Sequence, residues 1–203
     1  MPIVSPFAFG APAFSMNARR QSKPKSHAGS LLVAHPVLRD PGFRRTVVLL
    51  SGHDPEGALG IVLNRPMNRS LGSLGGEFAL GPLSEVPLFK GGPVAPQQVL
   101  LCAWRSQLGG ESEGFQLMFG IDPDKAAELV GQPGVGLRAF LGYAGWSAGQ
   151  LEKELKSDTW VVSNLPPTLM ETSPDVRLWR EVLGNVNAEW RLHANEPDDP
   201  SVN

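Results

Sequence analysis

The 203-residue chain contains a single cysteine, Cys102, and every apolar run in it is short. One cysteine cannot form an intramolecular disulfide, and such sparing use of cysteine is typical of a reducing compartment. A membrane-spanning helix needs roughly 18 to 20 consecutive apolar residues, and Gly, Pro, Arg or Asp interrupts each run before that length. We therefore expect a soluble, cytoplasmic protein without a membrane segment.

Acidic side chains are absent from the first 39 residues, which hold five of the 18 Lys and Arg residues. Residues 40–203 consequently carry 13 basic and 20 acidic side chains, a net charge of −7. An acidic body is a poor partner for a phosphate backbone. We therefore do not expect nucleic-acid binding, except for nonspecific contacts through the basic N-terminal tail.

The length and the 41% of hydrophobic residues suit one compact domain with loose ends. Residues 1–28 lack periodicity and are rich in Pro, Ser and Ala, which predicts a disordered basic tail. A targeting segment remains an alternative, and Met16 leaves open a later natural start. The domain is expected over residues 29–190, followed by a flexible acidic tail over residues 191–203.

Short strand patterns dominate the first half of the chain, and helical patterns appear among strands in the second half. Strands are expected over residues 30–34, 46–51, 58–64, 87–90, 98–103, 115–119, 137–141 and 159–163. Helices are expected over residues 123–130, 148–155 and 173–183, and residues 67–86 are expected to be irregular except for a turn near Leu71. This order predicts an α+β domain built on one bent, mixed and mainly antiparallel sheet with a few flanking helices.

The segment from Phe140 to Leu155, FLGYAGWSAGQLEKEL, predicts a strand, a glycine-rich corner and an amphipathic helix. Its glycines allow backbone conformations that a Cβ atom would forbid. Ser147 and Gln150 have the spacing of a capping box, so the helix is predicted to begin at Ala148.

Three motifs in fixed order resemble the YqgE/AlgH family of small bacterial proteins. They are LLVAHPVLRDPGFRRTVVLLSGHDPEGALGIVLNRP at residues 31–66, GGPV at 91–94 and GYAGWSAGQLEKE at 142–154. Long motifs in a fixed order make the resemblance specific. It departs from the family pattern at Pro55 and Ser147, and the segment after Pro66 is weakly matched.

The resemblance implies a single-domain α+β fold with a strongly bent sheet. One branch of the family is described as a transcriptional regulator of exopolysaccharide synthesis. The resemblance implies neither an enzymatic activity nor a cofactor, and we expect no cofactor here.

Metal binding and catalysis are the two alternatives that single residues suggest. His35, His53 and Asp54 have suitable ligand atoms, but no HxH or HxxxH spacing supports a metal site. We expect both imidazoles to cap strand ends and bond backbone carbonyls, and we expect no metal. A hydrolytic or thiol enzyme would use Ser51, Ser147 or Cys102 beside His53, with Arg45 as another polar partner, although no nucleophile motif surrounds them.

Backbone amides of GGPV and of the glycine-rich corner could form an anion-binding nest, but no lysine follows at the spacing of a phosphate-binding loop. Tight turns are the favoured interpretation of these glycines.

Polar residues at strand ends and aromatic residues at the corner predict a crevice. Arginine beside aromatic rings suits an anionic or planar group, although Arg45 or Arg65 could instead pair with Asp40, Asp54 or Glu56 to lock loops. The predicted crevice residues are His35, Asp40, Arg45, His53, Asn64, Arg65, Gly91, Gly92, Pro93, Tyr143, Gly145, Trp146 and Gln150.

The favoured function is that of a non-enzymatic regulatory or binding protein whose crevice holds a small ligand or a segment of a protein partner. No catalytic residue is assigned. An enzyme of unassigned hydrolytic or thiol class is the first alternative, and a DNA-binding regulator is the second. The sequence leaves the oligomeric state open.

Overall fold

The computed structural model describes residues 26–107, 114–166, 169, 174–187 and 190. Most of the predicted N-terminal tail and all of residues 191–203 lie outside these described residues. Within them the chain forms nine strands and three α-helices. They are β1 Leu31–Ala34, β2 Val47–Asp54, β3 Gly57–Val62, β4 Pro66–Ser70, β5 Pro87–Lys90, β6 Val94–Gln107, β7 Gly114–Phe119, α1 Pro123–Leu129, β8 Val135–Ser147, α2 Gln150–Lys156, β9 Trp160–Ser163 and α3 Val176–Val186.

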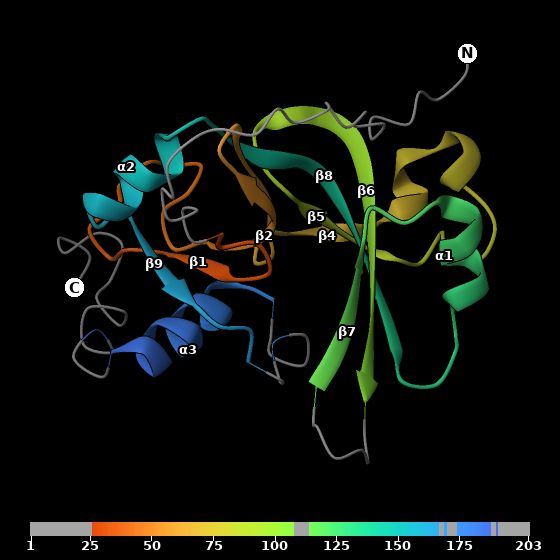
Figure 1. The fold of residues 1–203 in the computed structure, drawn as a ribbon. Coiled ribbons are helices and arrows are strands. Elements are labelled where there is room, and N and C mark those ends of the chain that lie inside the picture. The colour runs from red at the N-terminus through yellow and green to blue at the C-terminus, as the bar shows by residue number, and fades with distance from the viewer. Residues whose placement is uncertain (1–25, 108–113, 167–168, 170–173, 188–189, 191–203) are drawn as a thin grey trace, which may run out of the picture.

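The strands join into one curled sheet in the order β4-β5-β8-β3-β2-β1-β9, with β6 paired to β8 and β7 paired to β6. Neighbouring strands run antiparallel except for β5 and β8, which are parallel. Figure 1 shows β1, β9, α2 and α3 in one half of the molecule and β6, β7 and α1 in the other. The predicted single-domain α+β fold with a bent, mainly antiparallel sheet is confirmed.

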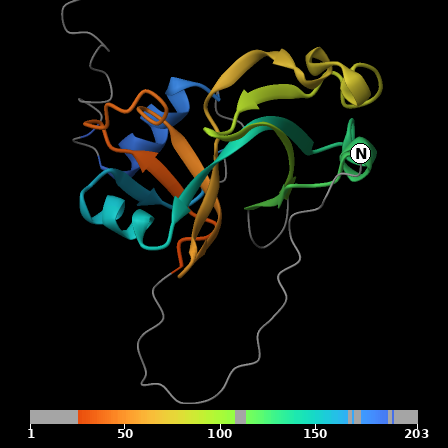
Figure 2. The same cartoon turned by 90° about the horizontal axis from the view of Figure 1, so that it is seen from above.

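Strand β8 connects the two halves and corrects the predicted corner. The strand does not stop at Leu141 but continues to Ser147, and it crosses the molecule in both views (Figures 1 and 2). Residues 139–141 pair with β5, whereas residues 144–147 pair with β3. Gly142, with φ of +69°, lies at the change of partner. The predicted corner is therefore a bend inside a continuous strand.

The start of α1 agrees with the prediction, and the start of α2 does not. Asp122 accepts a hydrogen bond from the Asp124 N–H at 2.9 Å, and Pro123 opens α1, as predicted. The prediction for α2 was wrong by two residues, because Gly149 adopts a left-handed conformation with φ of +71° and turns the chain before the helix starts. Half of the capping box forms, since Gln150 Oε1 accepts from the Ser147 N–H at 3.1 Å.

Helix α3 is capped by Asp175, which accepts from the Arg177 N–H at 2.8 Å, so it begins at Val176 and not at residue 173 as predicted. It also continues past Gly184 to Val186. On this helix Trp179 and Leu183 are buried in the main core.

The sequence did not predict β4 or the first residues of β6, and each of these segments contains a proline. Pro66 begins β4 instead of only ending β3, and β4 lies at the edge of the sheet, where a missing N–H is tolerated. Strand β6 starts at Val94 and contains Pro96, and its pairing with β8 is irregular between Val94 and Val99. Pro66 therefore lies in an edge strand, and Pro96 lies where the strand pairing is irregular. A sheet tolerates proline at both kinds of position.

The larger apolar cluster among the described residues joins α2 and α3 to strands that include β1, β2, β3, β8 and β9. Trp179 is 1% exposed, and its indole N–H donates to the Ala34 carbonyl at 2.7 Å. A second cluster, which includes Leu71, Leu88 and Ala126, packs in the other half of the molecule. None of the helices within the described parts of the chain has both the length and the apolar character needed to cross a bilayer.

Candidate functional site

A concave site of about 340 Å³ lies where four segments meet, and we call it the indole pocket. The loop before β2, the end of β8, one face of α2 and the start of β9 provide its walls. Gln150 and Glu154 face the pocket together because they are four residues apart on a helix. The lining residues are Leu38, Asp40, Phe43, Gly145, Trp146, Gln150, Glu154, Thr159 and Trp160.

The carboxylate of Glu154 joins three of these walls. Its Oε2 accepts the indole N–H of Trp146 at 2.8 Å and the indole N–H of Trp160 at 2.7 Å. Its Oε1 accepts the side-chain amide of Gln150 at 2.9 Å. Both tryptophans are more than nine-tenths buried, so these bonds satisfy donors that have little access to water. Glu154 therefore fixes the orientation of both indole rings.

Three aromatic rings pack against one another beside this carboxylate. Trp160 lies nearly perpendicular to Trp146, with centroids 6.0 Å apart, and nearly perpendicular to Phe43, with centroids 5.6 Å apart. Edge-to-face pairs at such distances are favourable because a positive ring edge meets a negative face. The arrangement gives the indole pocket rigid aromatic walls.

The opposite rim is formed by a tight turn that begins at Asp40. Its Oδ1 accepts the N–H groups of Gly42 and Phe43 at 2.9 and 3.0 Å, as expected for aspartate at the start of an Asp-Pro-Gly turn. The side chain is exposed, so its carboxylate also meets solvent. The same turn thus places a negative charge and the ring of Phe43 at the pocket.

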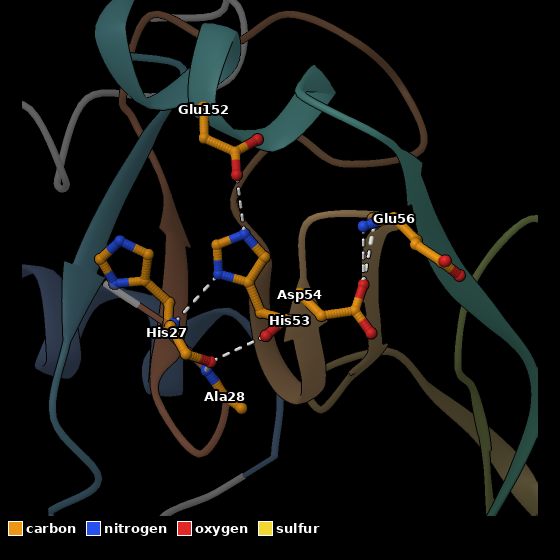
Figure 3. A network of polar contacts seen from close by, with 8 residues as sticks. His27, Ala28, His53, Asp54, Glu56 and Glu152 are labelled. Carbon is orange, nitrogen blue, oxygen red and sulfur yellow. Dashed lines mark hydrogen bonds and ion pairs between the residues drawn. The ribbon is translucent and has the colours of Figure 1, made fainter. Parts of the chain in front are cut away.

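A second depression, of about 480 Å³, lies at the end of the β2–β3 hairpin and shares Trp146 with the indole pocket. His53 lines it. His53 Nε2 lies 3.0 Å from Glu152 Oε1, and Nδ1 accepts the backbone N–H of His27 at 3.0 Å. Figure 3 shows the ring of His53 between these two partners. The rings of His27 and His53 stack with centroids 5.5 Å apart.

The contacts of His53 limit what it can do chemically. Because Nδ1 accepts a backbone N–H, the ring proton lies on Nε2 and is donated to Glu152. Both ring nitrogens therefore have partners, and among the residues that the structure describes neither nitrogen bonds a serine or a thiol. Ser51, one of the nominated nucleophiles, donates instead to the Leu59 carbonyl at 3.2 Å.

The pairing of Glu152 with His53 predicts an effect at acid pH. Hydrogen bonds from its own backbone N–H and from His53 lower the pKa of Glu152. A lowered pKa in the folded state adds stability above the pKa of the unfolded chain, about 4.3, and this stability is lost as the pH falls through the folded value. We expect Glu152→Gln to cost under about 1 kcal/mol at pH 5 and less at pH 3, because Glu152 is partly exposed.

Urea unfolding of both proteins at pH 5 and pH 3 measures this difference. A cost that is equal at the two pH values would show that the hydrogen bond from His53 to the ionised Glu152 carboxylate does not contribute.

Three other predicted crevice residues brace the loop between β1 and β2. Asn64, only 1% exposed, accepts the Val47 N–H at 2.9 Å and donates to the Arg45 carbonyl at 2.9 Å. Arg65 donates to the Arg44 carbonyl at 2.5 Å. The guanidinium of Arg45 lies 5.6 Å from the centre of a Trp179 ring. These side chains thus support loops and α3, and none of them lines either depression.

The glycines of GGPV serve close backbone packing. Gly91 N–H donates to the Leu141 carbonyl at 2.7 Å, and its own carbonyl accepts the Val62 N–H at 2.8 Å. A Cβ on Gly92 would lie 2.1 Å from the Tyr143 carbonyl carbon. The sequence favoured tight turns for these two glycines, whereas these contacts show close backbone packing against β3 and β8. The following Pro93 is exposed.

His35 and Tyr143 also lie away from the indole pocket. His35 Nδ1 accepts the Val37 N–H at 3.3 Å, and its ring meets Trp190 edge-on at 5.3 Å. Like His53, it accepts a backbone N–H through Nδ1 where we had expected a bond to a carbonyl. Tyr143 is half-buried against the main core.

Cys102 is buried, and burial raises its pKa to about 12. Because the thiolate is the reactive form, we expect Ellman's reagent at pH 7.5 to label the native protein at least about 100-fold more slowly than the protein in 8 M urea. Labelling of the native protein at a comparable rate would restore the thiol-enzyme hypothesis.

Of the predicted crevice residues, the indole pocket brings together Asp40, Gly145, Trp146 and Gln150. Sequence reasoning missed Phe43, Glu154 and Trp160. The spacing of Glu154 from Gln150 was a usable signal, since positions four apart share a helix face. Among the residues that the structure describes, no three His, Cys, Asp or Glu side chains gather around a possible metal position.

The fold and the pocket define a small single-domain α+β protein with a curled sheet, and comparison with known proteins identifies its family. The AlgH-like family model matches residues 31–191. A UPF0301 protein from Streptomyces coelicolor is 42% identical over 188 residues, covering 88% of this chain and 96% of the relative. A UPF0301 protein from Bacteroides fragilis is 32% identical over 179 residues, covering 86% and 90%.

Two solved structures share the fold. The solution structure of AlgH from Pseudomonas aeruginosa is 26% identical with a TM-score of 0.62, and the match covers 89% of this chain and 100% of AlgH. The crystal structure of a Corynebacterium diphtheriae protein is 22% identical with a TM-score of 0.64, covering 87% and 95%. The chain belongs to the AlgH-like family, so the resemblance to YqgE/AlgH proteins is confirmed.

Proposed function

We propose that this protein is a cytoplasmic, non-enzymatic binding protein whose ligand sits in the indole pocket. The observation that carries this proposal is the rigid aromatic and polar lining held together by Glu154, which accepts two indole N–H groups and one amide. Binding sites of this kind combine aromatic walls with a few fixed polar groups, in volumes from about 300 Å³ upward. The pocket of about 340 Å³ is at the lower end of that range, which suits a small molecule or one side chain of a partner protein.

The surroundings of the residues nominated for catalysis favour a binding function over an enzymatic one. His53 is engaged through both ring nitrogens, and Cys102 is buried in the core. The net charge of −7 over residues 40–203 argues against direct contact with DNA. A role in transcriptional regulation would therefore be indirect, through the bound ligand or a protein partner.

The indole N–H resonances of the tryptophans test the proposal in a two-dimensional ¹H–¹⁵N spectrum. We expect those of Trp146 and Trp160 to shift when small-molecule extract or lysate of the source cells is added. The indole of Trp179, which bonds Ala34 inside the core, serves as the internal control. Unchanged resonances of both pocket tryptophans in extract and lysate would contradict the proposal.

A further inference from the structure

We propose that the group bound in the indole pocket is an organic cation, an alkylammonium or a guanidinium. The inference deepens the proposed function and rests on it, since it names the chemistry that the same pocket recognises. It comes from two independent properties of the lining, namely the sign of its charges and the nature of its walls.

Among the described residues that line the pocket, the charged side chains are Asp40 and Glu154, and both are acids. The sequence suggested an anionic or planar group instead, because the predicted crevice grouped Arg45 and Arg65 with the aromatic residues Tyr143 and Trp146. In the folded protein Arg65 reaches the Arg44 carbonyl and Arg45 lies over Trp179, outside the pocket lining. An anion would therefore meet two negative charges, whereas a cation would meet two opposite ones.

The walls favour the same kind of ligand. Aromatic faces carry negative potential, and tryptophan attracts cations most strongly of the aromatic side chains. Trp146 and Trp160 each donate their indole N–H to Glu154, and such charge-assisted bonds polarise the donor ring. The carboxylate thus anchors both rings and makes their faces more attractive to a positive group.

Glu154 can also accept a hydrogen bond from a ligand. Its Oε1 accepts from Gln150, and a carboxylate oxygen has a second lone pair. Asp40 makes its two backbone bonds through Oδ1 alone, and its side chain is exposed at the rim. A cation between the helix and the turn would lie close to both carboxylates and against the rings.

Choline and 3,3-dimethylbutan-1-ol provide a direct test, because they share one shape and differ by a positive nitrogen in place of a carbon. We expect choline to bind at least about threefold more tightly than the neutral alcohol, as measured by tryptophan fluorescence and calorimetry. Asp40→Asn keeps the oxygen that holds the turn, and Glu154→Gln keeps one acceptor oxygen. Each should weaken choline binding at least about threefold, and Asp40→Asn should weaken choline binding more than it weakens binding of the alcohol.

Glu152→Gln is the matched control, since it removes one negative charge from the same helix outside the pocket lining. It should bind choline like the wild type. If Glu154→Gln does not fold, Asp40→Asn carries the test alone, because its turn can form unchanged. A short peptide containing trimethyllysine, compared with choline, decides whether the cation belongs to a protein partner or to a free molecule.

Equal affinity for choline and the alcohol, or unchanged choline binding in Asp40→Asn, would overturn the cation inference. The proposed function would survive that result if the alcohol or an extract component still shifted the Trp146 and Trp160 indole resonances. If no added compound shifted these resonances, both the cation inference and the proposed function would be contradicted.

Discussion

Gly142→Ala is expected to lower the free energy of unfolding by at least about 3 kcal/mol. Gly142 lies where β8 changes partners, with φ of +69°, a conformation that alanine adopts only with strain. Its Cβ would lie 2.6 Å from the Gly92 carbonyl oxygen and 2.7 Å from that of Val94. Both contacts are with backbone, so β6 and the GGPV segment would have to move.

Gly145→Ala provides the matched control three residues further along the same strand. A Cβ there would have its nearest neighbour 3.7 Å away, at an edge atom of the Tyr143 ring. We expect its unfolding free energy to stay within about 0.5 kcal/mol of the wild type in urea titrations. Equal stability of the two variants would contradict the role assigned to Gly142.

Trp179→Ala is expected to cost about 3 to 5 kcal/mol, the usual range for removal of a large buried aromatic side chain. The side chain is 1% exposed, packs between α3 and the sheet, and bonds the Ala34 carbonyl. Its loss would leave a cavity in the main core and an unpaired carbonyl at the end of β1. Chemical unfolding monitored by circular dichroism measures the change.

Leu80→Ala is the control for the loss of apolar surface alone, because Leu80 is 87% exposed. We expect it to change stability by less than about 0.5 kcal/mol. A cost for Trp179→Ala as small as that for Leu80→Ala would mean that α3 does not hold the core together.

Much of the fold was predictable because local patterns and tertiary packing agree. The run from Thr46 to Ser51 and the turn sequence after it gave the β2–β3 hairpin, and Asp122 with Pro123 gave the start of α1. The sequence was less informative where packing across the sheet overrides the local pattern. Gly142 would be read as the end of a strand, yet pairing with β3 carries β8 on to Ser147.

The candidate site was only partly predictable because its walls come from distant segments. Trp146 and Gln150 stood out in one motif, and they do line the pocket. Trp160 looked like an ordinary strand residue, and nothing in the sequence showed that its indole would bond Glu154. The partners of Arg45 and Arg65 were also hidden, since a sequence shows charges without showing which carbonyls they reach. For this reason the sequence suggested an anionic or planar ligand, whereas we propose a cation.

The central claim, that the indole pocket binds a cationic group, is tested most directly by intermolecular nuclear Overhauser effects from the choline methyl protons. The account predicts effects to ring protons of Phe43, Trp146 and Trp160, which line the pocket, and none to the core ring of Trp179. Effects confined to other residues, or none at choline concentrations that saturate the fluorescence change, would contradict it.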